Sequence, residues 1–108
     1  MFNRVYAKLK ENLATIREDR KPQVQNNLAW FLARCNQKLE EARDLSMQAV
    51  AAEPGNAAYI DTLAEIQFRL GNAEEAVKLE TKALLFRPDD EFMHRQVERF
   101  RAGVVKKQ

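Results

Sequence analysis

Apolar residues recur every three or four positions along most of the chain. In the first stretch, steps of 4, 3, 4 and 3 residues separate Phe2, Tyr6, Leu9, Leu13 and Ile16. This spacing places them on one face of a helix. The full pattern predicts an all-α chain with helices at residues 2–20, 23–35, 38–52, 57–70, 73–86 and 91–102, followed by a frayed tail at 103–108.

Residues with special backbone chemistry mark the predicted helix ends. Pro22 is expected to end the first helix, because proline cannot donate to the helical hydrogen-bond ladder. Gly71 suits the positive φ found after a helix C-terminus, and Asn72 is a candidate N-cap for the next helix. Either Asp89 or Asp90 is expected to cap the last helix.

Small residues recur at a fixed spacing in two segments. Ala42 is followed by an alanine seven residues later and by a proline twelve residues later, and the same spacings start from Ala76. A Leu–Ala pair at 28–29 recurs at 63–64. Paired helices approach closely only where their side chains are small, and a single hairpin of this size cannot bury its apolar face alone. The pattern therefore predicts two stacked hairpins, at residues 22–56 and 57–88.

Residues 22–88 resemble the tetratricopeptide repeat family, whose period is about 34 residues. The second hairpin carries the resemblance, with the signature residues Leu63, Ala64, Phe68, Gly71, Ala76, Ala83 and Pro88. The first hairpin lacks the turn glycine and has Asn36 and Gln37 there. The resemblance implies a right-handed α-solenoid, in which an N-terminal amphipathic helix (1–21) and a C-terminal capping helix with its tail (89–108) flank the hairpins.

The N-terminal segment, residues 1–21, does not match the repeat, and three interpretations stay open. It can be a degraded second helix of a lost repeat or a dedicated N-terminal cap. Its apolar stripe also permits pairing with a second copy of the chain.

Composition and charge narrow the function classes. The chain is 45% hydrophobic and 31% charged, with a net charge of +2. It has no apolar run of the roughly 18 residues that a membrane span needs, and the net charge is too small to indicate nucleic-acid binding. The single cysteine cannot form an internal disulfide, and no secretory signal precedes the first helix. We therefore expect a cytoplasmic protein that binds neither membrane nor nucleic acid.

Catalytic and metal-binding residue sets are sparse. Cys35 and His94 are the only cysteine and histidine, and no feature of the sequence requires them to meet as a nucleophile–base pair. Cys35 is expected to be a half-buried apolar filler. The acids around Asp89 fit helix-cap chemistry better than a metal site. We expect no enzyme activity, cofactor or metal.

The resemblance implies a concave surface, lined by the first helix of each hairpin, that binds a peptide or a partner helix. Matching the family's positions residue by residue assigns this surface to Asn26, Asn27, Trp30, Arg34, Asp61, Thr62, Glu65, Phe68, Arg69, Arg95 and Arg99. The aromatic residues would anchor the ligand, the asparagines would bond a peptide backbone, and the last two arginines would attract acidic groups.

A plainer interpretation accompanies each of these roles. Trp30 can be buried against the first helix, and Phe68 can belong to the core. Asp61, Glu65 and Arg69 are spaced four residues apart, so they can pair along one helix face. The asparagines can be ordinary polar surface.

These observations favour a non-catalytic protein–protein interaction module. One alternative is a structural or oligomerisation element that self-associates through the N-terminal helix. A second alternative is an accessory domain of a larger enzyme or assembly.

Overall fold

The computed structural model describes residues 1–107, and this part of the chain contains helices and no strand. A short 3-10 turn, η1, follows the first helix at Glu18–Arg20. The helices are α1 (Phe2–Thr15), α2 (Lys21–Arg34), α3 (Leu39–Ala52), α4 (Ala57–Arg69), α5 (Ala73–Phe86) and α6 (Glu91–Lys107). The predicted all-α class is confirmed, and the helix boundaries agree closely except at the first and last helices.

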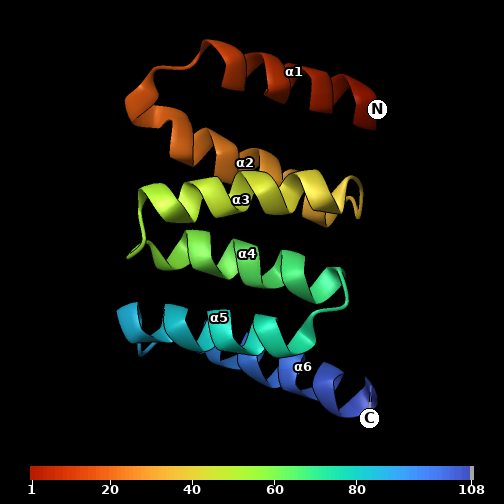
Figure 1. Cartoon of the computed structure of the whole chain (residues 1–108), viewed down its shortest axis with the longest axis vertical. Helices are drawn as coiled ribbons and strands as arrows, with labels where there is room; N and C mark the ends of the chain where they lie inside the picture. The colour runs from red at the N-terminus through yellow and green to blue at the C-terminus, as the bar shows by residue number, and fades with distance from the viewer. Residues whose placement is uncertain (108) are drawn as a thin grey trace.

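The helices are stacked in chain order along the long axis of the molecule, with the two termini at opposite ends (Figure 1). The Cα trace measures 42 × 28 × 19 Å. Each helix packs on the next one in the chain, and in addition α2 contacts α4 and α4 contacts α6. Within residues 1–107, α3 and α5 make no such contact. Hence α2, α4 and α6 form one layer of closely spaced helices.

Alanines allow the paired helices to pack closely. Ala42, Ala49, Ala64, Ala76 and Ala83 are all fully buried. The predicted burial of the repeated alanines is therefore confirmed, and Ala64 of α4 packs in one cluster with Ala76 of α5.

The core follows the stack from one end to the other. Leu28 and Leu32 of α2 pack with Ile66 of α4, and the apolar stripe of α1 lies against this cluster. Ile60 of α4 and Phe100 of α6 centre two further clusters nearer the C-terminus. No residue of α1 is fully buried, so α1 is covered on one side only.

The end of α1 differs from the prediction. The helix stops at Thr15, and Ile16 and Arg17 have extended backbone with ψ of 152° and 149°. Pro22 lies in the first turn of α2, so it begins the second helix instead of ending the first. A proline is well suited to this position, because the N–H that it lacks has no partner in the first turn of a helix.

The two hairpin turns place different residue types at positive φ. Gly71 has φ of 94°, as predicted, whereas in the first hairpin Asn36 and Lys38 have positive φ values of 53° and 49°. Asn72 precedes α5, but its side chain makes no cap hydrogen bond. Its Nδ2 donates instead to Gln67 Oε1 at 2.8 Å. Asn72 is therefore the N-cap residue of α5, as predicted, but its side chain bonds to the preceding helix and not to the first turn of α5.

The last helix is capped as predicted and runs further than predicted. Asp90 Oδ1 accepts a hydrogen bond from the backbone N–H of Met93 at 3.0 Å. The helix continues to Lys107, so the prediction of a frayed tail is wrong for residues 103–107, and residue 108 lies outside the described residues. Gly103 lies within this extension: a Cβ there would come within 2.5 Å of the Phe68 ring, so glycine allows α6 to pack against α4.

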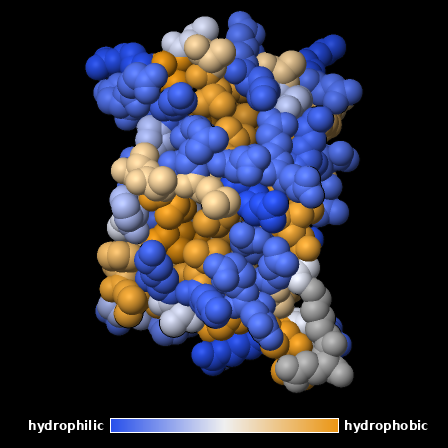
Figure 2. Space-filling model, in the orientation of Figure 1, coloured by the Kyte–Doolittle hydropathy of each residue, from blue (hydrophilic) through white to orange (hydrophobic). Residues whose placement is uncertain are grey.

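The surface is mostly hydrophilic, with separate apolar areas between the polar side chains on the face shown in Figure 2. Leu85, Phe86 and Phe92 are 77%, 50% and 48% exposed. Cys35 is also exposed, which corrects its expected role as a half-buried filler. None of the helices in residues 1–107 has the length and apolarity to cross a membrane.

Candidate functional site

The residues predicted to bind a partner come from α2, α4 and α6, the helices of the closely spaced layer. The structure brings only some of them together. Glu65, Phe68, Arg69 and Arg99 form one group of contacts. The remaining residues lie on the same three helices and range from buried to exposed.

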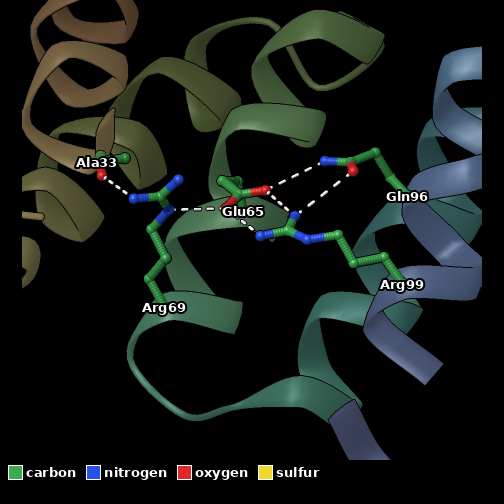
Figure 3. Close-up of polar contacts among 5 residues, drawn as sticks. All are labelled: Ala33, Glu65, Arg69, Gln96 and Arg99. Atoms are coloured by element: carbon green, nitrogen blue, oxygen red, sulfur yellow. Dashed lines mark hydrogen bonds and ion pairs between the residues drawn. The ribbon is translucent and has the colours of Figure 1, made fainter. Parts of the chain in front are cut away.

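Glu65 is the centre of this group. Its side chain is almost fully buried, with 4% exposed. The Arg99 guanidinium donates to both carboxylate oxygens, at 2.6 and 3.1 Å, and Arg69 Nε donates to Oε2 at 2.7 Å. Gln96 Nε2 donates to Oε1 at 3.1 Å (Figure 3). Two-point binding of a carboxylate by arginine is among the stronger polar contacts in proteins.

The same group reaches the preceding hairpin. Arg69 Nη1 donates to the backbone carbonyl of Ala33 at 2.5 Å. This carbonyl is in the last turn of α2, where helix carbonyls lack partners in the helix and carry a partial negative charge. We call Glu65, Arg69, Gln96 and Arg99 the Glu65 cluster. It connects α2, α4 and α6 through charge-assisted hydrogen bonds.

The arginines of the Glu65 cluster keep its central carboxylate ionised. Burial alone would raise the pKa of Glu65, but hydrogen bonds from Arg99 and Arg69 outweigh burial and lower it below its ordinary value. The hydrogen bond to Glu65 raises the pKa of Arg99. Arg99 was expected to attract acidic groups of a ligand, whereas its guanidinium is bound to Glu65.

Phe68 also has partners within the chain. Its ring centroid lies 4.9 Å from that of Phe100, and the Arg99 guanidinium lies 4.7 Å from the Phe68 centroid. The ring is half-buried and packs against Phe100 and Arg99, which favours its core interpretation over a free aromatic anchor.

One turn before Glu65, the structure places a carboxyl pair that sequence reasoning missed. Asp61 on α4 is half-buried, and Glu80 on α5 is fully buried. Burial, and then the hydrogen bond with Asp61, raise the pKa of Glu80 to about 9. Burial also raises the pKa of Asp61, while its hydrogen bond with Glu80 opposes this. At neutral pH Glu80 therefore holds the proton and donates it to Asp61.

A signal for Glu80 was present in the sequence. It lies four residues after Ala76 and three before Ala83, which puts it on the same helix face as the two alanines that were predicted to be buried. A charged residue at such a position indicates either a buried partner or a neutral carboxyl group.

The predicted residues of α2 are half-buried or exposed. Trp30 is half-buried, between its two predicted states, while Asn27 and Arg34 are exposed. Asn26 is half-buried, and its Oδ1 is buried without a hydrogen-bond donor among the described residues. A buried carbonyl-type oxygen of this kind can accept a hydrogen bond from a ligand.

Of two further residues that were predicted to face a ligand, one is buried and one is exposed. Thr62 is buried, and its hydroxyl donates to the Ala58 carbonyl at 3.1 Å, so it does not face a ligand as expected. The Arg95 side chain is 68% exposed, and its nearest acid is Glu91 at 4.0 Å. Arg95 is thus free to meet a ligand.

The structure does not bring Cys35 and His94 together. Cys35 follows α2 and His94 is in α6, and these two helices do not contact each other. The His94 Nε2 donates to the Pro88 carbonyl at 2.8 Å. Among the described residues, no group of three or more histidine, cysteine or acidic side chains is placed to hold a metal ion.

A surface hollow of about 680 Å³ opens elsewhere, at the turn between α4 and α5 and beside the end of α6. Acidic and basic side chains both line it, including Arg43, Glu75 and Lys78. None of the buried side-chain atoms that lack a hydrogen bond belongs to its lining, so it shows no preference for one ligand chemistry.

Comparison of the chain with protein-family models, with curated proteins and with solved structures found no match. The function is therefore argued from the arrangement of the three helices and from their side chains.

Proposed function

We propose that this chain is a non-catalytic protein-docking module that binds a peptide or a partner helix along α2, α4 and α6. In this proposal the chain is a right-handed α-solenoid of two tetratricopeptide-like hairpins between an N-terminal helix and a C-terminal cap. One observation carries it: α2 contacts α4 and α4 contacts α6, whereas α3 and α5 stay apart. Closer spacing in one of two layers curves a stack toward that layer, which makes its outer face concave.

The side chains on this face suit a polypeptide ligand. Trp30 presents part of a large ring, and tryptophan is among the residues that dominate interface energies. Asn26 Oδ1 lacks a donor, and a peptide N–H would remove the cost of leaving it unpaired. Arg34 and Arg95 are exposed at the two ends of the face, where they can add charge selectivity.

The Glu65 cluster has a different role, as the rigid floor of the docking face. Its side chains bond to one another across α2, α4 and α6. A face held in this way loses little conformational freedom when a ligand binds, which favours affinity. The proposed partner is thus recognised by Trp30 and the edge residues, above a preorganised floor.

A selection from a random peptide display library, with the whole chain as target, tests the proposal. Trp30 is the single tryptophan, so its fluorescence reports directly on peptides that reach the face. We expect Trp30→Ala to weaken the selected peptides by at least about tenfold.

Phe86→Ala is the matched control, because Phe86 is a half-exposed aromatic on α5, outside the α2–α4–α6 layer. It should leave the affinity of the peptides unchanged. Selected peptides that bind the Trp30→Ala variant as tightly as the parent chain would contradict the proposal.

A further inference from the structure

The α4–α6 interface contains a pairing position that lacks its cation. Glu65 of α4 binds Arg99 of α6. Asp61 lies one turn before Glu65, and Arg95 lies one turn before Arg99. The second pair does not form, because Arg95 extends into solvent beside Glu91. Where side chains are described, no lysine or arginine forms an ion pair with Asp61.

A fully buried carboxyl group lies behind this position. Both carboxyl oxygens of Glu80 are buried, and no donor from another described group reaches them. A neutral Glu80 has one proton to donate, and it goes to Asp61. Asp61 is itself half-buried with a buried Oδ1. The pair therefore lacks hydrogen-bond donors, and leaving buried acceptors without them is costly.

The charges around the pair add to this deficit. Asp61 and Glu65 face Glu80 from α4, and Asp90 faces it from the turn before α6. Arg87, at the end of α5, is the basic residue that acts on Asp61. The acidic groups around the pair outnumber the basic one, so the field at Asp61 and Glu80 is negative.

We propose that Asp61, with the buried Glu80 carboxyl group behind it, is the receptor for the ammonium or guanidinium group of a lysine or arginine in the docked segment. The inference rests on the proposed function, because it names one part of the partner's chemistry. A cationic side chain supplies Asp61 with the positive charge and the hydrogen-bond donors that the pair lacks. The Arg99–Glu65 contact, one turn away, shows that an arginine from a neighbouring element fits this interface.

Binding at this receptor releases a proton. In the free protein Glu80 is protonated at neutral pH, since its pKa is raised to about 9. When the cation binds, the Glu80 O–H bond breaks, the proton passes to solvent, and the pair changes from one negative charge to two. Affinity for the cation therefore increases with pH below about 9, by up to about tenfold per pH unit.

The test uses N-acetyl-lysine methylamide and N-acetyl-arginine methylamide as probes on the whole chain, followed by carboxyl-carbon NMR. We expect both probes to shift the Asp61 and Glu80 signals, and to bind more tightly at pH 8 than at pH 6. N-acetyl-norleucine methylamide, which has no charge, should shift neither signal. Equal shifts from the lysine and norleucine probes would overturn the inference.

Three variants sharpen this test. Asp61→Asn should weaken the lysine probe at least tenfold, whereas Asp44→Asn, an exposed acid on α3, should have no effect. Glu80→Gln keeps a donor to Asp61 but cannot release a proton, so it should retain binding and lose its pH dependence. A Glu80→Gln variant with the parent pH dependence would overturn the inference, even if Asp61→Asn fails to fold.

The result can be separated from that of the docking proposal. The small probes need no partner, and their binding is measured at the carboxyl signals and not at Trp30. If the probes do not bind but the selected peptides bind in a Trp30-dependent way, only the cation receptor is overturned. Calcium that shifts both carboxyl signals more strongly than the lysine probe would replace it with a metal site.

Discussion

A fully buried glutamate makes the stability of this protein depend on pH. The pKa of Glu80 rises from 4.5 to about 9 on folding. Between these values the folded state holds a proton that the unfolded state has lost, so the free energy of unfolding falls as pH rises. The slope is at most about 1.4 kcal/mol per pH unit. The raised pKa of Asp61 acts in the same direction.

Replacing Glu80 by glutamine should remove most of this dependence. We expect the stability of Glu80→Gln, relative to the parent chain, to increase from pH 5 to pH 9 in urea unfolding. Glu98→Gln, at an exposed position of α6, is the control and should follow the parent curve. If the stabilities of Glu80→Gln and the parent differ by a constant amount at all pH values, Glu80 does not hold its proton in the folded state.

Ala76 is a second residue whose size matters. It is fully buried between α4, α5 and α6. We expect Ala76→Leu to overpack this site and lower the free energy of unfolding by about 1–3 kcal/mol. The measurement is urea unfolding beside Ala51→Leu, which adds the same side chain at an exposed position of α3. Equal midpoints for the two variants would argue against the close approach of these helices.

At the scale of helices, the Glu65 cluster holds together elements that are distant in the sequence. Arg69 connects α4 to the Ala33 carbonyl of α2, and Arg99 connects α6 to α4. Their binding to one buried carboxylate means that a change at Glu65 is felt by three helices. The cluster thus couples the unfolding of α2, α4 and α6 more strongly than apolar packing alone would.

Removing the central charge should be strongly destabilising. Glu65→Gln leaves two guanidinium groups against a neutral amide, and we expect a loss of about 3 kcal/mol. Glu91→Gln breaks only an exposed ion pair with N–O distance 4.0 Å and should cost no more than about 0.5 kcal/mol. The two variants are compared by urea unfolding. Similar losses in the free energy of unfolding would show that the Glu65 cluster contributes no more to stability than an exposed ion pair.

For the molecule as a whole, the position of α1 bears on self-association. Its apolar stripe lies against the α2 cluster, and Tyr6 Oη donates to Glu41 of α3 at 2.7 Å. Lys10 bonds to the same carboxylate at 3.0 Å. A second copy cannot use this stripe unless α1 first leaves α2 and α3.

We therefore expect a monomer in solution. Light scattering should give the mass of one chain across the micromolar range. A concentration-dependent dimer that is lost when residues 1–16 are deleted would restore the alternative of self-association through α1.

The sequence predicted the local structure well and the site less well. Helical periodicity and the repeated alanines identified the helices and their buried faces, because these depend on neighbours within a few turns. It misplaced Pro22, whose effect depends on whether a helix precedes or follows it. It also underestimated the length of α6, because the packing of Gly103 against Phe68 cannot be read from the sequence.

The sequence by itself determined which residues share a helix face and which small residues let helices pair, since both follow from backbone geometry and side-chain size. Only the tertiary structure decided what the polar side chains bind. Arg99 and Glu65 are 34 residues apart in the sequence. Asp61 and Glu80 interact although they belong to different helices, α4 and α5. Such pairs depend on the distance and rotation between packed helices, which side-chain packing along the whole stack sets.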